Sequence, residues 1–261
     1  MIKIGIIGGS GMDDPNLLQD YKLTDVVTPY GHPSSAITEG TLNGIQIAIL
    51  PRHGKKHEIP PTKVNFRANI WALKKLGCTH IIATTAVGSL KEEIAPGHLV
   101  FPDQFIDRTT HREKTFFNAN QVCHIPMADP FCTELRRILF QTSQDLNMSA
   151  HSKGVVLTVE GPRFSTKAES NMFRMFGAEI INMSTVPEVV LAREAGLCYA
   201  SVAMSTDYDC WRESTEAVTL DEVIRVMREN ADKVKRLIIQ AIPRIQHLDC
   251  KCKQDVQSSI I

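Results

Sequence analysis

The chain of 261 residues is long enough for one large domain, and its composition, 43% hydrophobic and 22% charged, is that of an ordinary globular protein. Lys and Arg total 29, as do Asp and Glu, so the formal net charge is zero. We therefore expect no nucleic acid and no anionic membrane as a main partner. The sequence shows neither a signal-peptide pattern nor an apolar run of membrane-spanning length, so we expect a cytoplasmic protein.

Apolar runs typical of strands alternate along the chain with longer stretches that have the 3.6-residue spacing of helices. Asn43-Gly44 between two apolar runs predicts a hairpin turn, and Gly77 predicts the end of the first helix. The expected strands are residues 2–7, 36–42, 45–50, 80–84, 155–159, 180–183 and 199–204. The expected helices are residues 66–76, a helix starting at Asp129-Pro130, and helices starting at the capping boxes Thr166–Glu169, Thr185–Glu188 and Thr219–Glu222.

This alternation predicts the α/β class, and the hairpin with its short strands indicates a mixed rather than a purely parallel β-sheet. We expect a single domain over residues 1–245. The helical spacing is lost after Pro243, so residues 246–261 are expected to form a flexible tail.

The seven cysteines are odd in number and scattered, unlike a secreted disulfide framework. The pair Cys250-Lys251-Cys252 is the exception, and it is compatible with two reduced thiols or with a redox-active or stabilising pair. We expect no zinc site, because no second CxC or CxxC motif and no suitably spaced His pair completes four ligands.

Several motifs offer groups that bind a small anion. Ser10 lies in the glycine-rich turn after the first strand, and Arg52-His53 follow the hairpin with a guanidinium fork that suits phosphate oxygens. Thr85 and Ser184 add hydroxyl groups at the carboxyl ends of expected strands, where α/β sheets usually bind ligands. Each motif alone is equally compatible with an ordinary loop.

A second group of residues suits a flat base and its sugar. Asp207 and Asp209 come directly after an apolar strand, where two carboxylates are costly unless they are paired or functional. A buried, protonated carboxyl group donates to a purine N7, and a carboxylate accepts from a 6-amino group. Phe164 offers a stacking ring and Met183 an apolar surface, although both residue types are common in cores.

Seven motifs, in this order, resemble the methylthioadenosine phosphorylase branch of the purine nucleoside phosphorylase superfamily over about residues 2–243. The motifs are residues 6–11, 52–54, 65–73, 104–107, 160–165, 182–188 and 206–209. The resemblance implies an α/β domain with a central mixed sheet flanked by helices, assembled as a homotrimer or a dimer of trimers. It implies phosphorolysis of 5'-methylthioadenosine to adenine and 5-methylthioribose 1-phosphate, an activity of purine and methionine salvage.

Carried over by position, the resemblance also implies a role for individual residues. Phosphate is expected to be bound by Ser10, Arg52, His53, Thr85, Ala86 and Ser184. Substrate contacts are expected from Phe164, Met183, Asp207, Tyr208, Asp209 and, from a neighbouring subunit, His124. Substrate preference is expected to depend on Ser165, Leu220 and Val223. No metal and no organic cofactor are implied, because inorganic phosphate is itself a substrate.

The expected catalytic residue is Asp207, as the proton donor to the leaving purine. The nearest alternative is a broad purine nucleoside phosphorylase acting on adenosine, inosine or guanosine. A nucleoside hydrolase would give the anion-binding residues no role, and a non-catalytic nucleotide-binding module would not need Asp207. The glycine-rich turn lacks the spacing of a dinucleotide-dependent dehydrogenase.

Overall fold

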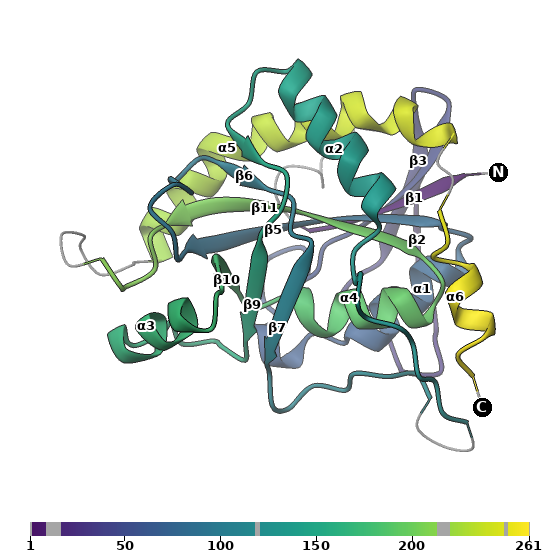
Figure 1. Ribbon diagram of the computed structural model, residues 1–261. Coiled ribbons are helices and arrows are strands. Elements are labelled where there is room, and N and C mark those ends of the chain that lie inside the picture. Colours follow the sequence, from purple (N-terminus) through teal and green to yellow (C-terminus); the bar gives the residue numbers. More distant parts are fainter. Residues whose placement is uncertain (1, 9–16, 118–120, 213–219, 248–249, 261) are drawn as a thin grey trace.

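A computed structural model gives the fold (Figure 1) and describes residues 2–8, 17–117, 121–212, 220–247 and 250–260. The strands are β1 (Lys3–Ile7), β2 (Gln19–Thr24), β3 (Ile37–Leu42), β4 (Ile45–Leu50), β5 (His80–Ser89), β6 (Leu99–Val100), β7 (Gln104–Arg108), β8 (Ala150–His151), β9 (Val155–Val159), β10 (Ile180–Asn182) and β11 (Cys198–Asp207). The α-helices are α1 (Phe66–Lys75), α2 (Thr133–Asp145), α3 (Lys167–Met175), α4 (Thr185–Glu194), α5 (Leu220–Ala241) and α6 (Gln254–Gln257). Short 3-10 helices cover Pro61–Lys63 and Ile242–His247.

All eleven described strands belong to one mixed sheet. Its main path has the order β2-β3-β4-β1-β5-β10-β9-β7, and β11 pairs with β5 as a branch that continues through β6 to β8. β1 lies parallel to both β4 and β5, whereas β3 is antiparallel to β2 and β4. The expected mixed sheet in a single α/β domain is therefore confirmed.

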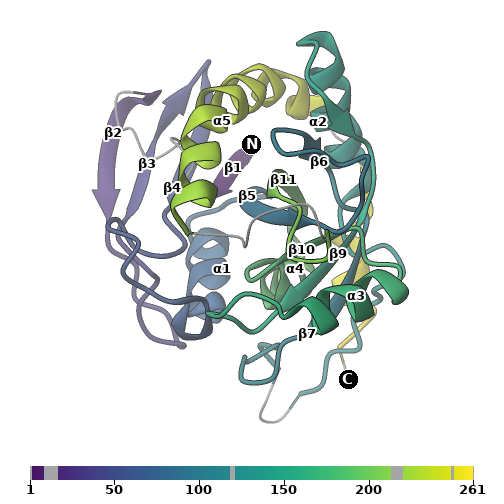
Figure 2. The same cartoon turned by 90° about the vertical axis from the view of Figure 1, so that its left-hand side faces the viewer.

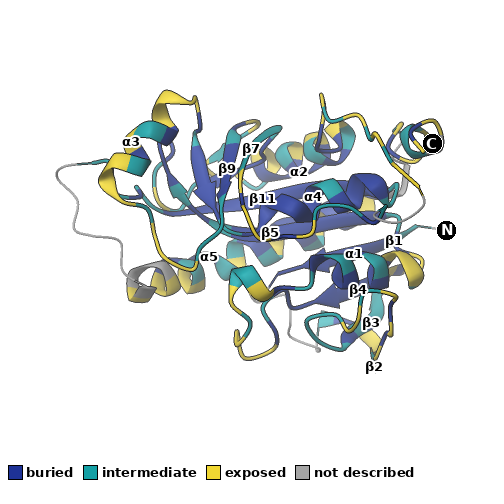
Figure 3. Ribbon diagram, turned by 90° about the horizontal axis from the view of Figure 1, so that it is seen from below, coloured by how far each residue is buried: buried dark blue, intermediate teal, exposed yellow. Residues whose placement is uncertain are grey.

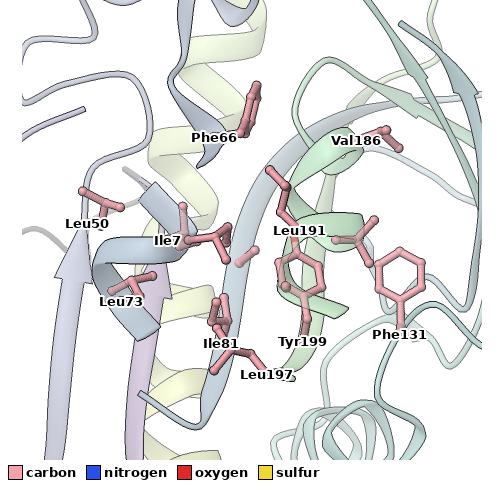
Figure 4. Packing of buried hydrophobic residues seen from close by; sticks show 14 of the residues in the cluster. Ile7, Leu50, Phe66, Leu73, Ile81, Phe131, Val186, Leu191, Leu197 and Tyr199 are labelled. Atoms are coloured by element: carbon pink, nitrogen blue, oxygen red, sulfur yellow. The ribbon is translucent and has the colours of Figure 1, made fainter. Parts of the chain in front are cut away.

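Helices cover both faces of this sheet (Figure 2). On one side, α1 and α4 bury side chains such as Leu73 and Leu191 against Ile7 and Ile81 of the strands (Figure 4). On the other side, α2 and α5 bury Leu135, Leu237 and their neighbours in a second cluster. Each fully buried leucine contributes about 1.5–3 kcal/mol relative to an exposed one, which explains why the buried residues gather on the sheet and on the helix faces turned toward it (Figure 3).

Local sequence signals account for several of the boundaries. Asn43 and Gly44 have φ values of 51° and 76°, which a tight hairpin turn requires. Gly77, at φ 84°, follows α1. The capping box at Thr166 and Glu169 is present at the start of α3. The hairpin, α1 and α3 are thus formed where the sequence predicted them, while the capping box at Thr219–Glu222 lies outside the residues whose side chains are described.

Three boundaries differ from the sequence prediction. β5 continues to Ser89 and β11 to Asp207, because the two strands pair with each other along that length, so hydroxyl-bearing residues expected in loops are strand residues. α2 begins at Thr133 rather than at Asp129-Pro130, because Cys132 is extended and its N–H donates to the carbonyl of Tyr199. The Thr185–Glu188 capping box is wrong, since the Glu188 side chain binds Arg52 instead of a helix N-terminus.

The C-terminal segment packs against the body, in contrast to the loose tail that the sequence predicted. Cys252 is buried in the core cluster of α2 and α5. Asp255 accepts a hydrogen bond from Arg193 at 2.8 Å, and the carbonyl of Ser259 accepts one from the His124 N–H at 2.9 Å. The described residues 250–260 are therefore held by core packing, an ion pair and backbone hydrogen bonds.

Candidate active site

The sheet contains a gap along one edge of β5. β11 pairs with β5 from His80 to Gly88 and so occupies one of its two edges. On the other edge, β1 pairs with residues 80–83, and β10 joins only at Gly88 and Ser89. Residues 84–87 thus lie between the ends of two neighbouring strands. Such an interruption, where the sheet changes partner strand, is the usual ligand position in α/β proteins.

Arg52 extends into this gap from the end of β4. Its Nη1 donates to the Thr84 carbonyl at 2.9 Å, so Arg52 binds a backbone carbonyl in the stretch of β5 that lies between β1 and β10. Its Nε and Nη2 donate to the Glu188 carboxylate at 2.7 and 2.9 Å, and the Tyr199 hydroxyl donates to the same carboxylate at 2.8 Å. Burial opposes the charge of Arg52, but Glu188 outweighs it and raises the Arg52 pKa, so the guanidinium is a fixed buried cation.

Two buried hydroxyl groups lie at the same gap. Thr85 Oγ1 and Ser184 Oγ are 2.9 Å apart, and Thr85 also donates to the Ala86 carbonyl at 3.0 Å. Asn182 fixes this arrangement by donating to Thr185 Oγ1 at 2.7 Å and to Thr85 Oγ1 at 3.3 Å. The adjacent residues Thr85 and Ala86 are therefore brought together with Ser184, which lies 99 positions after Thr85, as the phosphate hypothesis requires.

His53 is oriented through one of its ring nitrogens. Nδ1 lies 2.9 Å from the Ile59 carbonyl, which can only accept, so Nδ1 carries a proton and donates. The ring stacks on His57 with a centroid distance of 4.6 Å. Burial and the charge of Arg52 lower the pKa of His53 to about 4. The ring is thus neutral near pH 7, with a lone pair on Nε2.

The two carboxylates expected to bind a base lie at the end of β11. Asp207 accepts from the Asp209 N–H and from the Thr206 hydroxyl, both at 2.7 Å. Asp209 is buried, and this burial raises its pKa. Gly88 on the adjacent β5 is needed here, because a Cβ at that position would lie 3.0 Å from Asp207 Oδ1.

The loop over residues 160–165 approaches both groups. Arg112 holds it by donating to the Glu160 carbonyl at 2.9 Å and to the Val186 carbonyl at 2.6 Å. At Gly161, where φ is 68°, a Cβ would overlap the sulfur of Met183, so the loop lies directly on that side chain. The loop is thereby positioned against the strand ends that carry the candidate site.

The tip of the loop carries two of the sequence-predicted residues. Ser165 accepts at its carbonyl from the Cys210 thiol at 3.3 Å, so it lies next to the Asp207–Asp209 segment. Phe164 is 44% exposed, so its ring is accessible from solvent at the tip of the loop.

Not every predicted site residue joins this group. The Tyr208 hydroxyl donates to the Glu92 carbonyl at 3.4 Å, and its ring packs against Trp211 and Arg212. His124 is exposed beside the C-terminal segment, and no described hydrogen bond or ring contact links it to the gap in the sheet. Ser10 lies outside the residues that the structure describes. Leu220 and Val223 belong to α5, but their side chains are not among those described.

Comparison with known proteins identifies the family. Residues 3–243 match the phosphorylase superfamily. The chain belongs to that superfamily. The S-methyl-5'-thioadenosine phosphorylase of Danio rerio is 55% identical over 253 residues, which are 95% of this chain and 90% of the relative. The protein of the same name from Thermofilum pendens is 51% identical, covering 100% and 99% of the two chains.

Solved structures agree with this assignment. The methylthioadenosine phosphorylase of Schistosoma mansoni in complex with adenine superposes with a TM-score of 0.94 at 44% identity, covering 99% of each chain. A variant of the adenosine/methylthioadenosine phosphorylase of the same organism, in complex with methylthioadenosine, has a TM-score of 0.93. Within the described part of the phosphorylase, no helix is both long and apolar enough to cross a membrane.

Sequence reasoning missed three residues that support the site: Glu188, Tyr199 and Asn182. The signal for Glu188 was a single carboxylate within the apolar stretch around Pro187 and Val189, because a buried acid needs a counter-charge and Arg52 needs one as well. For Tyr199 and Asn182 no comparable signal exists. Their hydrogen bonds depend on which strands become neighbours, and that is a property of the fold.

Proposed function

We propose that this phosphorylase cleaves 5'-methylthioadenosine with inorganic phosphate, forming adenine and 5-methylthioribose 1-phosphate. Relatives that carry this activity in their names span nearly the whole chain. The observation that carries the proposal is the buried Arg52 cation, fixed by Glu188 beside the hydroxyl groups of Thr85 and Ser184. A hydrolase has no use for such an anion site, whereas a phosphorolytic enzyme requires one.

In this proposal phosphate lies at the gap of β5. Arg52 and the hydroxyl groups of Thr85 and Ser184 supply the donors around the anion. His53 presents Nε2, which donates to phosphate only after it takes up a second proton. The complete proposed set is Ser10, Arg52, His53, Thr85, Ala86 and Ser184.

The purine lies between the Asp207–Asp209 segment and the 160–165 loop. Cleavage leaves negative charge on the base and positive charge on the sugar, so a proton donor at N7 and an anion below the sugar stabilise the transition state. Asp207 is the proposed donor, and a carboxylate there also suits adenine, whose N6 donates, better than a 6-oxopurine. As the proton donor, Asp207 must be protonated when the nucleoside is bound.

The sugar and its 5' end complete the substrate. Phe164 and Met183 are proposed to contact the ribose, with Tyr208 and Asp209 beside the base. Ser165, Leu220, Val223 and His124 of the partner subunit are proposed to select the methylthio group. This requires a trimer or a dimer of trimers. No metal or organic cofactor takes part in the proposed reaction, and a cytoplasmic location is proposed with it.

The test is adenine release from 5'-methylthioadenosine with and without phosphate, compared with adenosine and inosine. We expect release only with phosphate and little cleavage of inosine. Arg52→Lys, which keeps the charge but loses the two-pronged contact, is expected to raise the phosphate KM. Turnover without phosphate would make the chain a hydrolase, and inosine cleavage at an equal rate would make it a broad purine nucleoside phosphorylase. Adenosine is the substrate to rank most carefully, since a solved relative is named for both nucleosides.

A further inference from the structure

Four cysteines from three separate segments converge at the end of the sheet away from the candidate active site. Cys132 precedes α2, Cys198 begins β11, and Cys250 and Cys252 belong to the C-terminal segment. Their sulfur atoms all lie within 4.8 Å of one another. Cys250 is half-buried and the other three are buried. The sequence argued against zinc because Cys250-Lys251-Cys252 had no partner motif, but the fold supplies the two missing ligands.

We propose that Cys132, Cys198, Cys250 and Cys252 form a structural site for one zinc ion. Four thiolates around a centre is the ligand set that zinc and iron–sulfur centres use. With zinc–sulfur bonds of about 2.3 Å, the edges of the tetrahedron are about 3.8 Å long. The four sulfur atoms lie within 4.8 Å of one another, and the pair Cys198–Cys250, at 2.9 Å, would move apart by about 0.9 Å to bind the ion. Binding displaces one proton from each thiol, so Zn²⁺ and four thiols give four protons and a centre of charge −2.

The surroundings offer groups that favour this negative charge. His80 of β5 is in register with Cys198 of β11, and it is 5% exposed. Its Nε2 is buried without a hydrogen-bond partner among the described residues. A thiolate centre would give this nitrogen, once protonated, an acceptor.

The N-terminus of helix α2 also favours negative charge at this site. Cys132 is its N-cap residue and makes no side-chain capping bond, so its sulfur is placed at the positive end of a 13-residue helix. Arg136 lies one turn further on, and its guanidinium donates to the carbonyls of Phe101 and Ser152. The helix N-terminus therefore favours negative charge on the metal-bound sulfur of Cys132.

Disulfide pairing is the competing explanation. All seven cysteines, which lie in the described part of the chain, are free thiols. The sulfur atoms of Cys198 and Cys250 are 2.9 Å apart, beyond a disulfide bond of about 2.05 Å. Two disulfides or one metal ion would each use all four sulfurs, so the oxidation state of these cysteines and their metal content decide between the two.

The site lies far from the proposed base site. Cys198 and Asp207 are the two ends of β11, about 30 Å apart at 3.3 Å per residue. Zinc would join the C-terminal segment to the start of α2 and the start of β11, so its role is to stabilise the fold and to hold the C-terminal segment. This inference does not depend on the proposed function.

The test uses the full chain, purified under reducing conditions without chelator. Zinc and iron are measured per chain by plasma mass spectrometry for the parent, for Cys252→Ser and for Cys123→Ser, which removes a cysteine outside the cluster. We expect about one zinc in the parent and in Cys123→Ser and a large loss in Cys252→Ser. Chelator competition should show affinity about 10–100-fold weaker in His80→Leu, as expected when a group supporting the ligands is removed.

Two outcomes would overturn the proposal. One is disulfide-linked peptides between these cysteines, found after alkylation of the protein in denaturant without reductant, together with no bound metal. The other is a fully reduced chain that binds no zinc even when the ion is added to it. If the site binds zinc, a chelator lowers the melting temperature of the folded parent and leaves that of Cys252→Ser unchanged. This measurement does not depend on enzymatic activity.

Discussion

Glu188→Gln tests whether the buried ion pair with Arg52 is what holds the anion site together. The substitution keeps the side-chain volume and removes the charge. Glu188 now accepts two bonds from Arg52 and one from Tyr199, and a glutamine oxygen cannot replace both carboxylate oxygens. The amide nitrogen would instead face a donor. Arg52, which is 4% exposed, would keep its charge without a counter-charge.

The size of the effect follows from this burial. Breaking a buried pair by removing one partner costs about 3–5 kcal/mol, mainly because an uncompensated charge stays in the interior. For a chain of 261 residues the unfolding entropy is about 0.55 kcal/mol/K, at about 2.1 cal/mol/K per residue. The expected fall in melting temperature is therefore about 5–9 °C at fixed protein concentration.

Glu194→Gln is the matched control. Glu194 lies on the same helix and is also buried, and among the described residues it accepts from the Thr115 hydroxyl and the Phe116 N–H, each at 2.8 Å. Burial raises its pKa, so it holds its charge less firmly than an acid paired with arginine. Losing part of two such hydrogen bonds costs about 1 kcal/mol, or about 2 °C.

The assay is thermal unfolding of both variants across a phosphate series. If phosphate binds at Arg52, it supplies the missing negative charge, so its stabilising effect should be larger in Glu188→Gln than in the parent. For the parent, phosphate at 100 times its Kd gives about 2.7 kcal/mol. Equal melting temperatures for the two glutamine variants would refute the energetic argument. If phosphate stabilises Glu188→Gln no more than it stabilises the parent, Arg52 is not part of the phosphate site.

Three further predictions concern other parts of the site. The pKa of His53 is about 4 in the folded protein and near 6.5 in the unfolded chain, so between these pH values the unfolded state binds more protons. The contribution of His53 to the free energy of unfolding therefore falls by up to about 3 kcal/mol as the pH drops from 6.5 to 4. Denaturation of His53→Gln across this pH range should lack that dependence. Asp207→Asn should lower kcat/KM for 5'-methylthioadenosine about 10²–10⁴-fold and raise the relative rate on inosine, and an unchanged nucleoside ratio would contradict its role. Gly161→Ala should raise the KM for 5'-methylthioadenosine, because the added Cβ displaces Met183. The control is Gly177→Ala, whose glycine has a similar positive φ but open space around it, so this variant should lose only about 1–2 kcal/mol of stability. Equal KM values for the two variants would exclude Met183 from the substrate site.

The sequence predicted those parts of the fold that depend on local chemistry. The Asn43-Gly44 hairpin, the end of α1 at Gly77 and the Thr166 cap follow from backbone preferences of a few neighbouring residues. The ends of β5 and β11 did not follow, because the residues there are polar and their strand conformation comes from pairing with each other. The start of α2 was missed for the same reason: Cys132 is held by a bond to β11.

The same distinction applies to the candidate site. Arg52, Thr85 and Ser184 were found because their chemistry suits an anion and because they follow apolar runs. Their support was not found, since the Glu188 contact joins residues 136 positions apart and the four sulfurs come from segments spread over more than 100 positions. Residue type indicates which groups are able to act. Only the strand order determines which of them meet.

β11 connects all three regions of chemistry in this phosphorylase. Nine of its ten residues are buried, and it is paired with β5 on one edge and β6 on the other, so it has little freedom to move. It carries Cys198 at the cysteine cluster, Tyr199 on the Glu188–Arg52 pair, and Asp207 at the proposed base site. Tyr199 is next to Cys198 in sequence, so loss of the cluster should disturb the Arg52 end before the Asp207 end. A cysteine variant that weakens phosphate binding more than nucleoside binding would therefore place the coupling at Tyr199.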